Sequence, residues 1–240
     1  MRKLRIAPNE HYHLYNRGNR GQGIFLDEND WSRFLFLILY CQSPLPVSNI
    51  GHRVKLYIKH ERFSLYDVLV DDIAKRRYVE LVNFTLMSNH FHLTIKETEE
   101  HGIARYMQRV LNAYTKYFNT KYKKEGHLFQ GPFQAVHVKT NEQLLYLSTY
   151  IHKNPRAIRE WRDKEEKYPY GSLQDYVKEN RWGKLLCSDI VLGQFKTSSP
   201  SVILAHAGIQ SSRDAYKKFV ADSPAKTLEE KLDAEHLIED

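Results

Sequence analysis

Residues 86–95 of this 240-residue chain read LMSNHFHLTI. Apolar and β-branched residues flank Ser88-Asn89, a pattern that predicts two adjacent strands joined by a tight turn. Side chains two apart on a strand leave the same face, so His90 and His92 point together and Phe91 turns into the core. Two imidazoles close together on a rigid strand are suitable ligands for a divalent metal ion.

Composition narrows the class of protein. The chain has a formal net charge of +7 and contains 16 Tyr, 11 Phe and 3 Trp. Basic residues interleaved with aromatic ones suit a polyanion with unpaired bases, because they neutralise phosphates and stack on rings. The two cysteines are far apart, which excludes a cysteine-rich zinc site. No apolar run is long enough to span a membrane and no signal peptide is evident, so we expect a cytoplasmic protein without membrane contact.

The hydrophobic periodicity predicts an alternation of strands and helices. The expected elements are a strand at 11–16, a helix at 27–41 capped by Asp27, two strands within 78–95, a helix at 101–122, a strand at 134–138 and a helix at 140–154. A capping box at 140–143 should start the last helix, and Pro155 should end it. This order predicts an α+β, ferredoxin-like sandwich, in which helices cover one side of an antiparallel sheet.

Residues outside these elements are harder to place. Residues 43–77 contain two prolines and a basic stretch and are interpreted as an insertion. Ser198-Ser199-Pro200 indicates a linker. Beyond it we expect a short helix at 211–219 capped by Ser212, and an acidic tail at 227–240 that stays solvated. Residues 160–182 are expected to cover the active face or to grip flanking nucleic acid.

Several side chains are candidates for contacts with a nucleic acid. The glycine-rich loop at 17–23 suits a phosphate, although a plain turn is the alternative. One side of the helix at 101–122 is basic and could follow a phosphate backbone, while His127 either stacks on a base or packs within its loop. The candidates are Arg17, Asn19, Arg20, Arg105, Arg109, Lys116, His127 and Gln130.

The helix at 140–154 supplies the remaining candidates. Tyr150 and Asn154 are four apart and share a helix face. If this helix crosses the sheet beside the histidine strand, His90, His92 and Asn154 present three neutral metal ligands, with Tyr150 one turn away. His11 and His13 form a second same-face pair; we expect it to be less rigid, because it lies near the terminus and lacks apolar neighbours.

These motifs carry a family resemblance. Residues 89–93, NHFHL, resemble the HUH motif (histidine, hydrophobe, histidine) of single-tyrosine transposases. Further matching motifs lie at 12–25, 126–131, 150–155 and 170–176, in the same order as in the REP-associated tyrosine transposases. The resemblance covers roughly residues 8–180. It implies a catalytic domain over 1–180, with 181–240 as a C-terminal extension of short helices and an acidic tail.

The resemblance also implies a function. Tyr150 would be the nucleophile, His90 and His92 the metal ligands, and Asn154 would take the place of the family's amide ligand. The expected activity is cleavage and strand transfer of single-stranded DNA at REP-like hairpins, through a 5′-phosphotyrosine and with Mg²⁺ or Mn²⁺, in a nucleoid-associated protein. The chain departs from the pattern at Ser88, at Pro132 and in the segment 43–77. The loss of a basic residue at Pro132 puts one phosphate contact in doubt.

Two other classes of function stay open. A non-catalytic module that binds single-stranded DNA or RNA would not need Tyr150, Asn154 and the two histidines together. A metallohydrolase that uses activated water would keep its activity without Tyr150. The sequence also leaves monomer and homodimer open.

Overall fold

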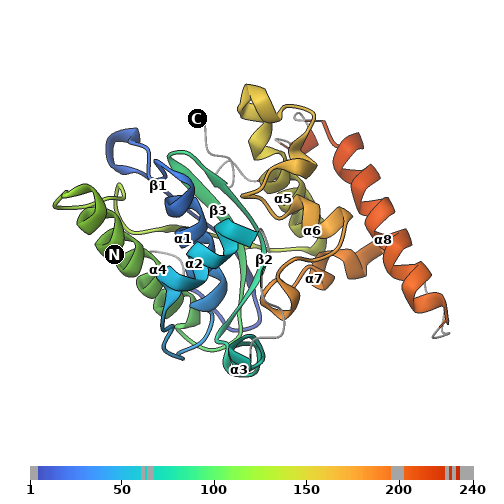
Figure 1. The fold of residues 1–240 in the computed structure, drawn as a ribbon. Helices are drawn as coiled ribbons and strands as arrows, with labels where there is room; N and C mark the ends of the chain where they lie inside the picture. Colours follow the sequence, from blue (N-terminus) through green and yellow to red (C-terminus); the bar gives the residue numbers. More distant parts are fainter. Residues whose placement is uncertain are drawn as a thin grey trace.

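A four-stranded antiparallel sheet forms the centre of the computed structural model, which describes residues 5–60, 63, 68–195, 203–224, 227, 228, 231 and 232. The strands are β1 (His11–Arg17), β2 (Val79–Met87), β3 (His90–Glu97) and β4 (Gln134–Val138), in the order β2-β3-β1-β4 (Figure 1). The chain order of strands and sheet-covering helices is βαββαβ, the ferredoxin-like succession. The α+β class and the antiparallel sheet are therefore confirmed.

The predicted turn at Ser88-Asn89 joins β2 to β3. Met87 pairs with His90 and Leu86 with Phe91, so the hairpin closes directly across this turn. On β3, Phe91, Leu93 and Ile95 are fully buried on the face opposite to the histidines. The alternation of histidine and apolar residues along 90–95 thus predicted β3 and its buried face correctly.

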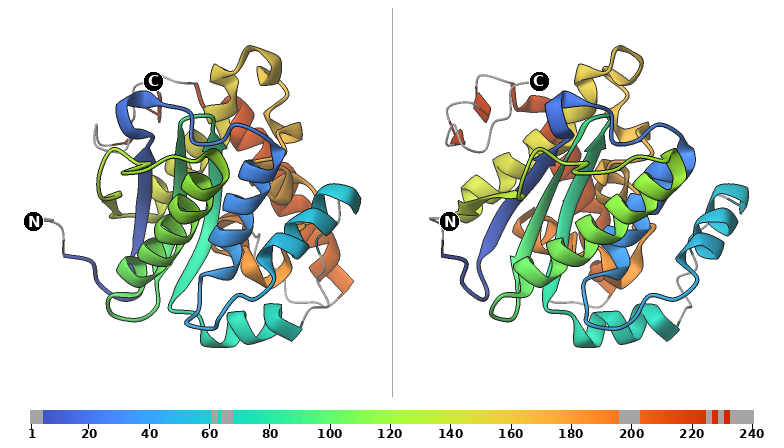
Figure 2. Two further views of the ribbon diagram at one scale, coloured as in Figure 1. Left: turned by 60° about the vertical axis from the view of Figure 1, so that its left-hand side comes forward. Right: turned by 90° about the vertical axis from the view of Figure 1, so that its left-hand side faces the viewer.

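Helices α1 (Glu28–Tyr40) and α4 (Gly102–Tyr122) cover one face of the sheet (Figure 2). Asp27 caps α1 as predicted: its carboxylate accepts from the Asp30 backbone N–H at 3.1 Å. Phe34 of α1 packs against Phe91 of β3 at 5.0 Å between ring centroids, and against Tyr114 of α4 at 5.0 Å. These fully buried rings join the two helices to the sheet, because they come from α1, α4 and β3.

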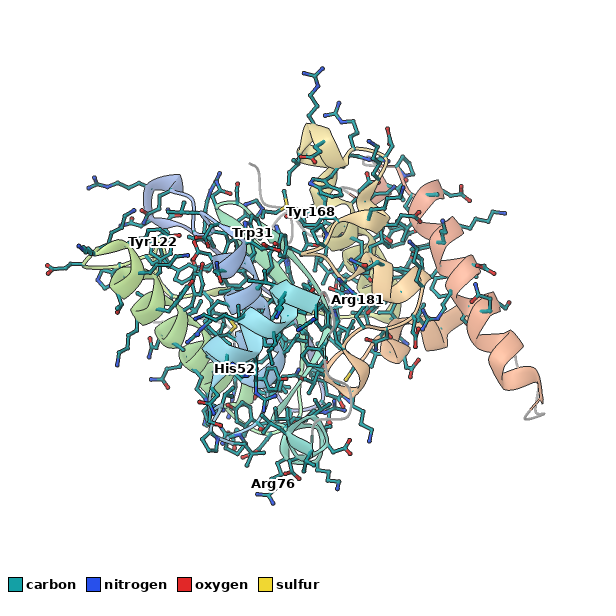
Figure 3. The ribbon with its side chains drawn as sticks, viewed as in Figure 1. Trp31, His52, Arg76, Tyr122, Tyr168 and Arg181 are labelled. Carbon is teal, nitrogen blue, oxygen red and sulfur yellow. The ribbon has the colours of Figure 1, made fainter. Side chains whose placement is uncertain are left out.

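Residues 43–77 contain two helices, α2 (Ile50–His60) and α3 (Val68–Arg76). Helix α2 packs on α1 and buries Ile50 and Val54. The side of α2 that carries His52 is exposed (Figure 3). That these residues are an insertion stays a prediction.

The opposite face of the sheet lies toward α5 (Asn141–Lys153) and the C-terminal helices (Figure 1). These are α6 (Leu173–Val177), α7 (Asp189–Leu192) and α8 (Ile203–Asp222). Short 3₁₀ turns connect the elements: η1 (Asn19–Gly21), η2 (Asn154–Ala157), η3 (Arg159–Trp161), η4 (Glu165–Lys167), η5 (Gly183–Leu185) and η6 (Gly193–Phe195). The histidine face is consequently covered by helices rather than open to solvent.

Residues 168–172 attach this second layer to the edge of the sheet. The Leu86 N–H donates to the Tyr170 carbonyl at 2.9 Å, and the Ser172 N–H donates to the Phe84 carbonyl at 3.0 Å. Tyr170 stacks on Trp31 of α1 at 4.6 Å, and Figure 3 shows Trp31 and Tyr168 near the same edge. Residues 160–182 were expected to cover the active face or to grip DNA; of these, residues 168–172 lie along β2.

Three local predictions need correction. Helix α5 ends at Lys153, next to the predicted end, but Asn154 keeps helical angles, φ −49° and ψ −41°, because the chain tightens into the 3₁₀ turn η2. The Gln143 side chain accepts from the Lys139 N–H at 2.7 Å, so the capping box is only half formed, with Thr140 accepting from the Gln143 N–H. Helix α8 begins at Ile203, and Ser212 lies inside it as a buried residue, not as its cap.

Two further predictions fall on residues that the structure does not describe. The linker at 198–200 is one of them. The other is the acidic tail, whose acidic side chains are Glu229, Glu230, Asp233, Glu235, Glu239 and Asp240.

Candidate active site

His90 and His92 lie side by side on β3, on the face toward α5. Their ring centroids are 5.0 Å apart with the planes at 88°, and their exposed fractions are 2% and 0%. The Nδ1 atom of His90 lies 2.7 Å from Oδ1 of Asn89. Because an amide oxygen only accepts, His90 donates from Nδ1 and keeps the lone pair on Nε2.

His13 of β1 joins this pair. Strand β1 lies next to β3 in the sheet, in a register that sets Tyr15 opposite His92 and His13 opposite Thr94. The Nε2 atom of His13 lies 3.0 Å from Nδ1 of His92, and the two rings stack at 5.2 Å and 17°. The expectation that His13 is poorly held is therefore wrong, because the side chain is fully buried.

Helix α5 brings Tyr150 and Asn154 to the same place. The Tyr150 ring stands edge-on to His92, with centroids 5.6 Å apart, and to His13 at 6.3 Å. Asn154 donates from Nδ2 to the Tyr150 carbonyl at 3.2 Å. Thr85 of β2 donates to the Ile151 carbonyl at 2.7 Å and so fastens the helix to the sheet. His90, His92, Tyr150 and Asn154 are thus brought together from one strand and one helix.

Burial keeps the imidazole of His92 neutral. Desolvation, followed by the neighbouring His13 and His90, lowers the pKa of His92 well below its usual value, while the Asn154 side chain raises it by a smaller amount. The Nε2 atom of His92 is buried and makes no hydrogen bond to any described residue. A neutral, buried imidazole nitrogen that carries a lone pair has the form that a metal ligand needs.

The donor set fits a divalent metal ion with mixed nitrogen and oxygen ligands. His90 and His92 would supply nitrogen, and the amide of Asn154 would supply oxygen. Within the described part of the chain, no group of three or more His, Cys, Asp or Glu side chains has the geometry of a metal site. Two imidazoles and one amide leave coordination positions for water or a phosphate oxygen.

A groove of about 900 Å³ lies on the α4 side of the sheet. Four of the candidate nucleic-acid contacts line it, namely Asn19, Lys116, His127 and Gln130. Its apolar wall includes Leu111, Phe129 and Phe133. Amides, a cation and aromatic rings in one groove provide the chemistry that holds an unpaired base beside its phosphate.

The groove is linked to the histidine strand through the backbone. The Gln130 N–H donates to the Arg17 carbonyl at 2.9 Å, and Arg17 pairs with His90 in the strand register. Arg20 is exposed in the adjoining turn and adopts a left-handed conformation, φ 55°. The loop 128–131 therefore lines the groove and is also hydrogen-bonded to β1, the strand beside the histidine strand.

Two of the candidate arginines are engaged within the protein. Arg109 donates to the carbonyls of Ser43 and Leu45, the latter at 2.7 Å, and to the Tyr78 hydroxyl at 3.2 Å. Arg105 pairs with Glu99 at 2.9 Å and lies over the Tyr78 ring. The basic side expected along α4 is thus divided: Lys116 lines the groove, and the two arginines fasten neighbouring loops.

His152 of α5 has a structural position. It is 1% exposed and its ring nitrogens lie 2.7 Å from the Tyr216 hydroxyl and 2.8 Å from the Ser172 hydroxyl. Its bonds join α5 to α8 and to the segment at 168–172.

Residues 48–154 match the family model described as IS200-like transposases. The resemblance to the IS200-like transposases is confirmed. The matched range includes His90, His92, Tyr150 and Asn154, together with most of 43–77. It supports a transposase-like role in DNA processing.

The comparison with solved structures gives a further match. A solved structure described as a REP-associated tyrosine transposase bound to a REP hairpin aligns with 79% of this chain and 93% of its own, at 12% identity and a TM-score of 0.46. Comparison with curated proteins gave no match.

Among the helices of the described residues, none combines the length and hydropathy needed to cross a bilayer.

Proposed function

We propose that this protein is a metal-dependent strand transferase that cuts single-stranded DNA through a covalent bond to Tyr150. The observation that carries the proposal is the edge-on contact between Tyr150 and His92 at 5.6 Å, within the segment that matches the transposase family. A half-buried tyrosine beside two histidines and an amide has no evident use in a module that only binds.

The proposed reaction is a transesterification. The Tyr150 oxygen attacks the phosphorus, the new P–O bond forms, and the bond from phosphorus to the 3′ oxygen breaks. The phenol proton leaves to solvent, and the departing oxygen takes up a proton to become a 3′ hydroxyl. The DNA stays attached as a 5′-phosphotyrosine, so attack by another 3′ hydroxyl completes strand transfer.

The residues around Tyr150 have separate tasks in this proposal. A divalent ion such as Mg²⁺ or Mn²⁺, when held by His90, His92 and Asn154, supplies polarisation of the phosphate and stabilises charge on the leaving oxygen. Helix α5 positions the Tyr150 ring, because Thr85 anchors the Ile151 carbonyl one residue further along. The buried histidines keep their side of the ring closed to water.

We infer the substrate from the family resemblance as single-stranded DNA at or beside short, imperfect hairpins of the REP type. The groove lined by Asn19, Lys116, His127 and Gln130 is proposed to take the unpaired nucleotides. These residues are polar, cationic or next to aromatic rings, which suits bases and phosphates without requiring a duplex.

The test uses hairpin-bearing single-stranded DNA labelled at either end, with Mn²⁺ or with chelator, on a denaturing protein gel. The 3′-end label should travel with wild-type protein, whereas the 5′-end label should leave on a shortened strand. Tyr150→Phe and chelation should abolish the adduct. Tyr146→Phe is the matched control, because Tyr146 lies one turn earlier on α5 and packs against Phe219 at 5.3 Å.

Two results would overturn the proposal. DNA that binds but never becomes covalently attached would favour a binding module. Metal-dependent cleavage that survives in Tyr150→Phe would make water the nucleophile and the protein a metallohydrolase.

A further inference from the structure

We propose that His13 is a positioning residue that holds His92 in the tautomer with its proton on Nδ1, leaving Nε2 available to a divalent ion. The inference rests on the proposed function for the identity of the ligand. It concerns a residue outside the histidine, tyrosine and amide set discussed above.

A single proton links the two imidazoles. Nε2 of His13 and Nδ1 of His92 are 3.0 Å apart, so one of them donates and the other accepts. If Nδ1 of His92 donates, its Nε2 has a lone pair and no proton. In the reverse arrangement, Nε2 of His92 would carry a proton at a buried position where no described residue meets the geometry of a hydrogen bond; the Asn154 side chain is near enough to affect the pKa of the ring but is not so aligned. Buried N–H groups without an acceptor are rarer than unsatisfied acceptors, which favours the first arrangement.

His90, the other proposed histidine ligand, also donates its Nδ1 proton to a neighbouring acceptor. His90 donates from Nδ1 to the amide oxygen of Asn89 at 2.7 Å, which leaves its lone pair on Nε2. Metal-binding histidines generally donate their second N–H to an acceptor that fixes ring orientation and tautomer. Asn89 supplies that acceptor for His90. For His92 the corresponding group is the imidazole of His13.

Packing makes His13 suitable for this task. Both rings are fully buried and stack at 17°, and His13 also contacts the Tyr15 ring at 5.1 Å. The β1 and β3 backbones are joined by their ladder from His11 to Arg17, so the sheet fixes the distance between the Cα atoms of the two residues. His13 is therefore a rigid acceptor.

Two variants of His13 distinguish the effect of its acceptor nitrogen from the effect of its aromatic ring. His13→Phe keeps a flat aromatic side chain against His92 but removes the acceptor nitrogen. His13→Gln offers a carbonyl oxygen as a replacement acceptor. Thermal melts of both variants establish that they fold before any binding is interpreted.

The first readout is the tautomer of His92 in metal-free protein, from long-range ¹H–¹⁵N spectra assigned with a His92→Asn sample. Wild type and His13→Gln should show the proton on Nδ1, and His13→Phe should lose this preference. The second readout is Mn²⁺ affinity from electron paramagnetic resonance titration. His13→Phe should bind about 10–100-fold more weakly, as expected for loss of an outer-shell partner, and His13→Gln should recover most of the affinity.

The outcomes distinguish this inference from the proposed function. A proton on Nε2 of His92 in wild type, or equal Mn²⁺ affinity in wild type and folded His13→Phe, overturns the role of His13 and leaves the strand-transferase proposal intact. Absence of Mn²⁺ binding to wild type counts against the proposed function, while the spectra still report whether His13 sets the tautomer.

Discussion

Tyr150 stands edge-on to His92, with ring centroids 5.6 Å apart and planes at 87°. One ring comes from α5 and the other from β3, and Asn154 follows Tyr150 by one helical turn. The side chain of Asn154 approaches His92 closely enough to raise the pKa of that imidazole. The proposed nucleophile and one of the three proposed ligands, Asn154, therefore depend on the same helix.

Removing the amide of Asn154 should weaken metal binding without unfolding the protein. In Asn154→Ala, Mn²⁺ affinity should fall by about tenfold or more, because one of three protein ligands is lost. Asn154→Asp keeps an oxygen at this position and should retain binding. Calorimetric titration measures both, and an unchanged affinity in Asn154→Ala would remove this residue from the ligand set.

Lys116 should contribute to DNA binding through charge alone. Lys116→Gln should weaken binding of single-stranded DNA by a similar factor for different sequences, and should reduce the slope of log K against log salt by about one. Fluorescence anisotropy at several salt concentrations measures this slope. Lys217→Gln is the control, because Lys217 lies on α8 and pairs with Glu166 at 2.7 Å. Equal slopes in wild type and Lys116→Gln would show that DNA does not use this side of the groove.

Asp30 should contribute more to stability than its neighbour Asp27. Asp30 is fully buried and accepts from the hydroxyls of Tyr117 at 3.0 Å and Tyr122 at 2.6 Å, and it pairs with Lys121. Asp30→Ala should lower the free energy of unfolding by roughly 2–5 kcal/mol, since buried donors lose their acceptor. Asp27→Ala removes a helix cap and should cost about 1 kcal/mol. Urea unfolding compares the two, and the reverse order would contradict this account.

His152 should make the protein less stable in mild acid. Burial lowers the pKa of His152 from 6.5 to about 3. Between these values the unfolded chain binds a proton that the folded protein does not, so the free energy of unfolding falls as pH decreases from about 6.5 toward about 3. The slope should reach at most about 1.4 kcal/mol per pH unit for this one group.

His152→Gln isolates this contribution. The variant keeps a polar side chain but does not titrate, so its stability should depend less steeply on pH than that of wild type. His92 contributes in the same direction in both proteins, because its pKa is also lowered. Identical slopes in urea unfolding from about pH 7 to about pH 5 would exclude His152 as a source of acid sensitivity.

The sequence by itself determined the features that depend on near neighbours in the chain. Alternation along 86–95 placed the hairpin and put His90 and His92 on one face, since successive side chains on a strand point to opposite faces. Asp27 was identified as a cap because its acceptor serves an N–H three residues away. The four-residue spacing of Tyr150 and Asn154 likewise fixed their common helix face.

Tertiary structure decided which distant groups meet. The contact between His13 and His92 could be identified only once the β1–β3 register was known. The alternation of residues along one strand does not determine how it pairs with its neighbour. Arg109 donates to the carbonyls of Ser43 and Leu45, which come from a distant part of the chain. The Gln143 side chain accepts from the Lys139 N–H instead of from the N–H of Thr140. The packing of helices and strands determines which side chains from different elements meet, and the local periodicity of the sequence does not predict these partners.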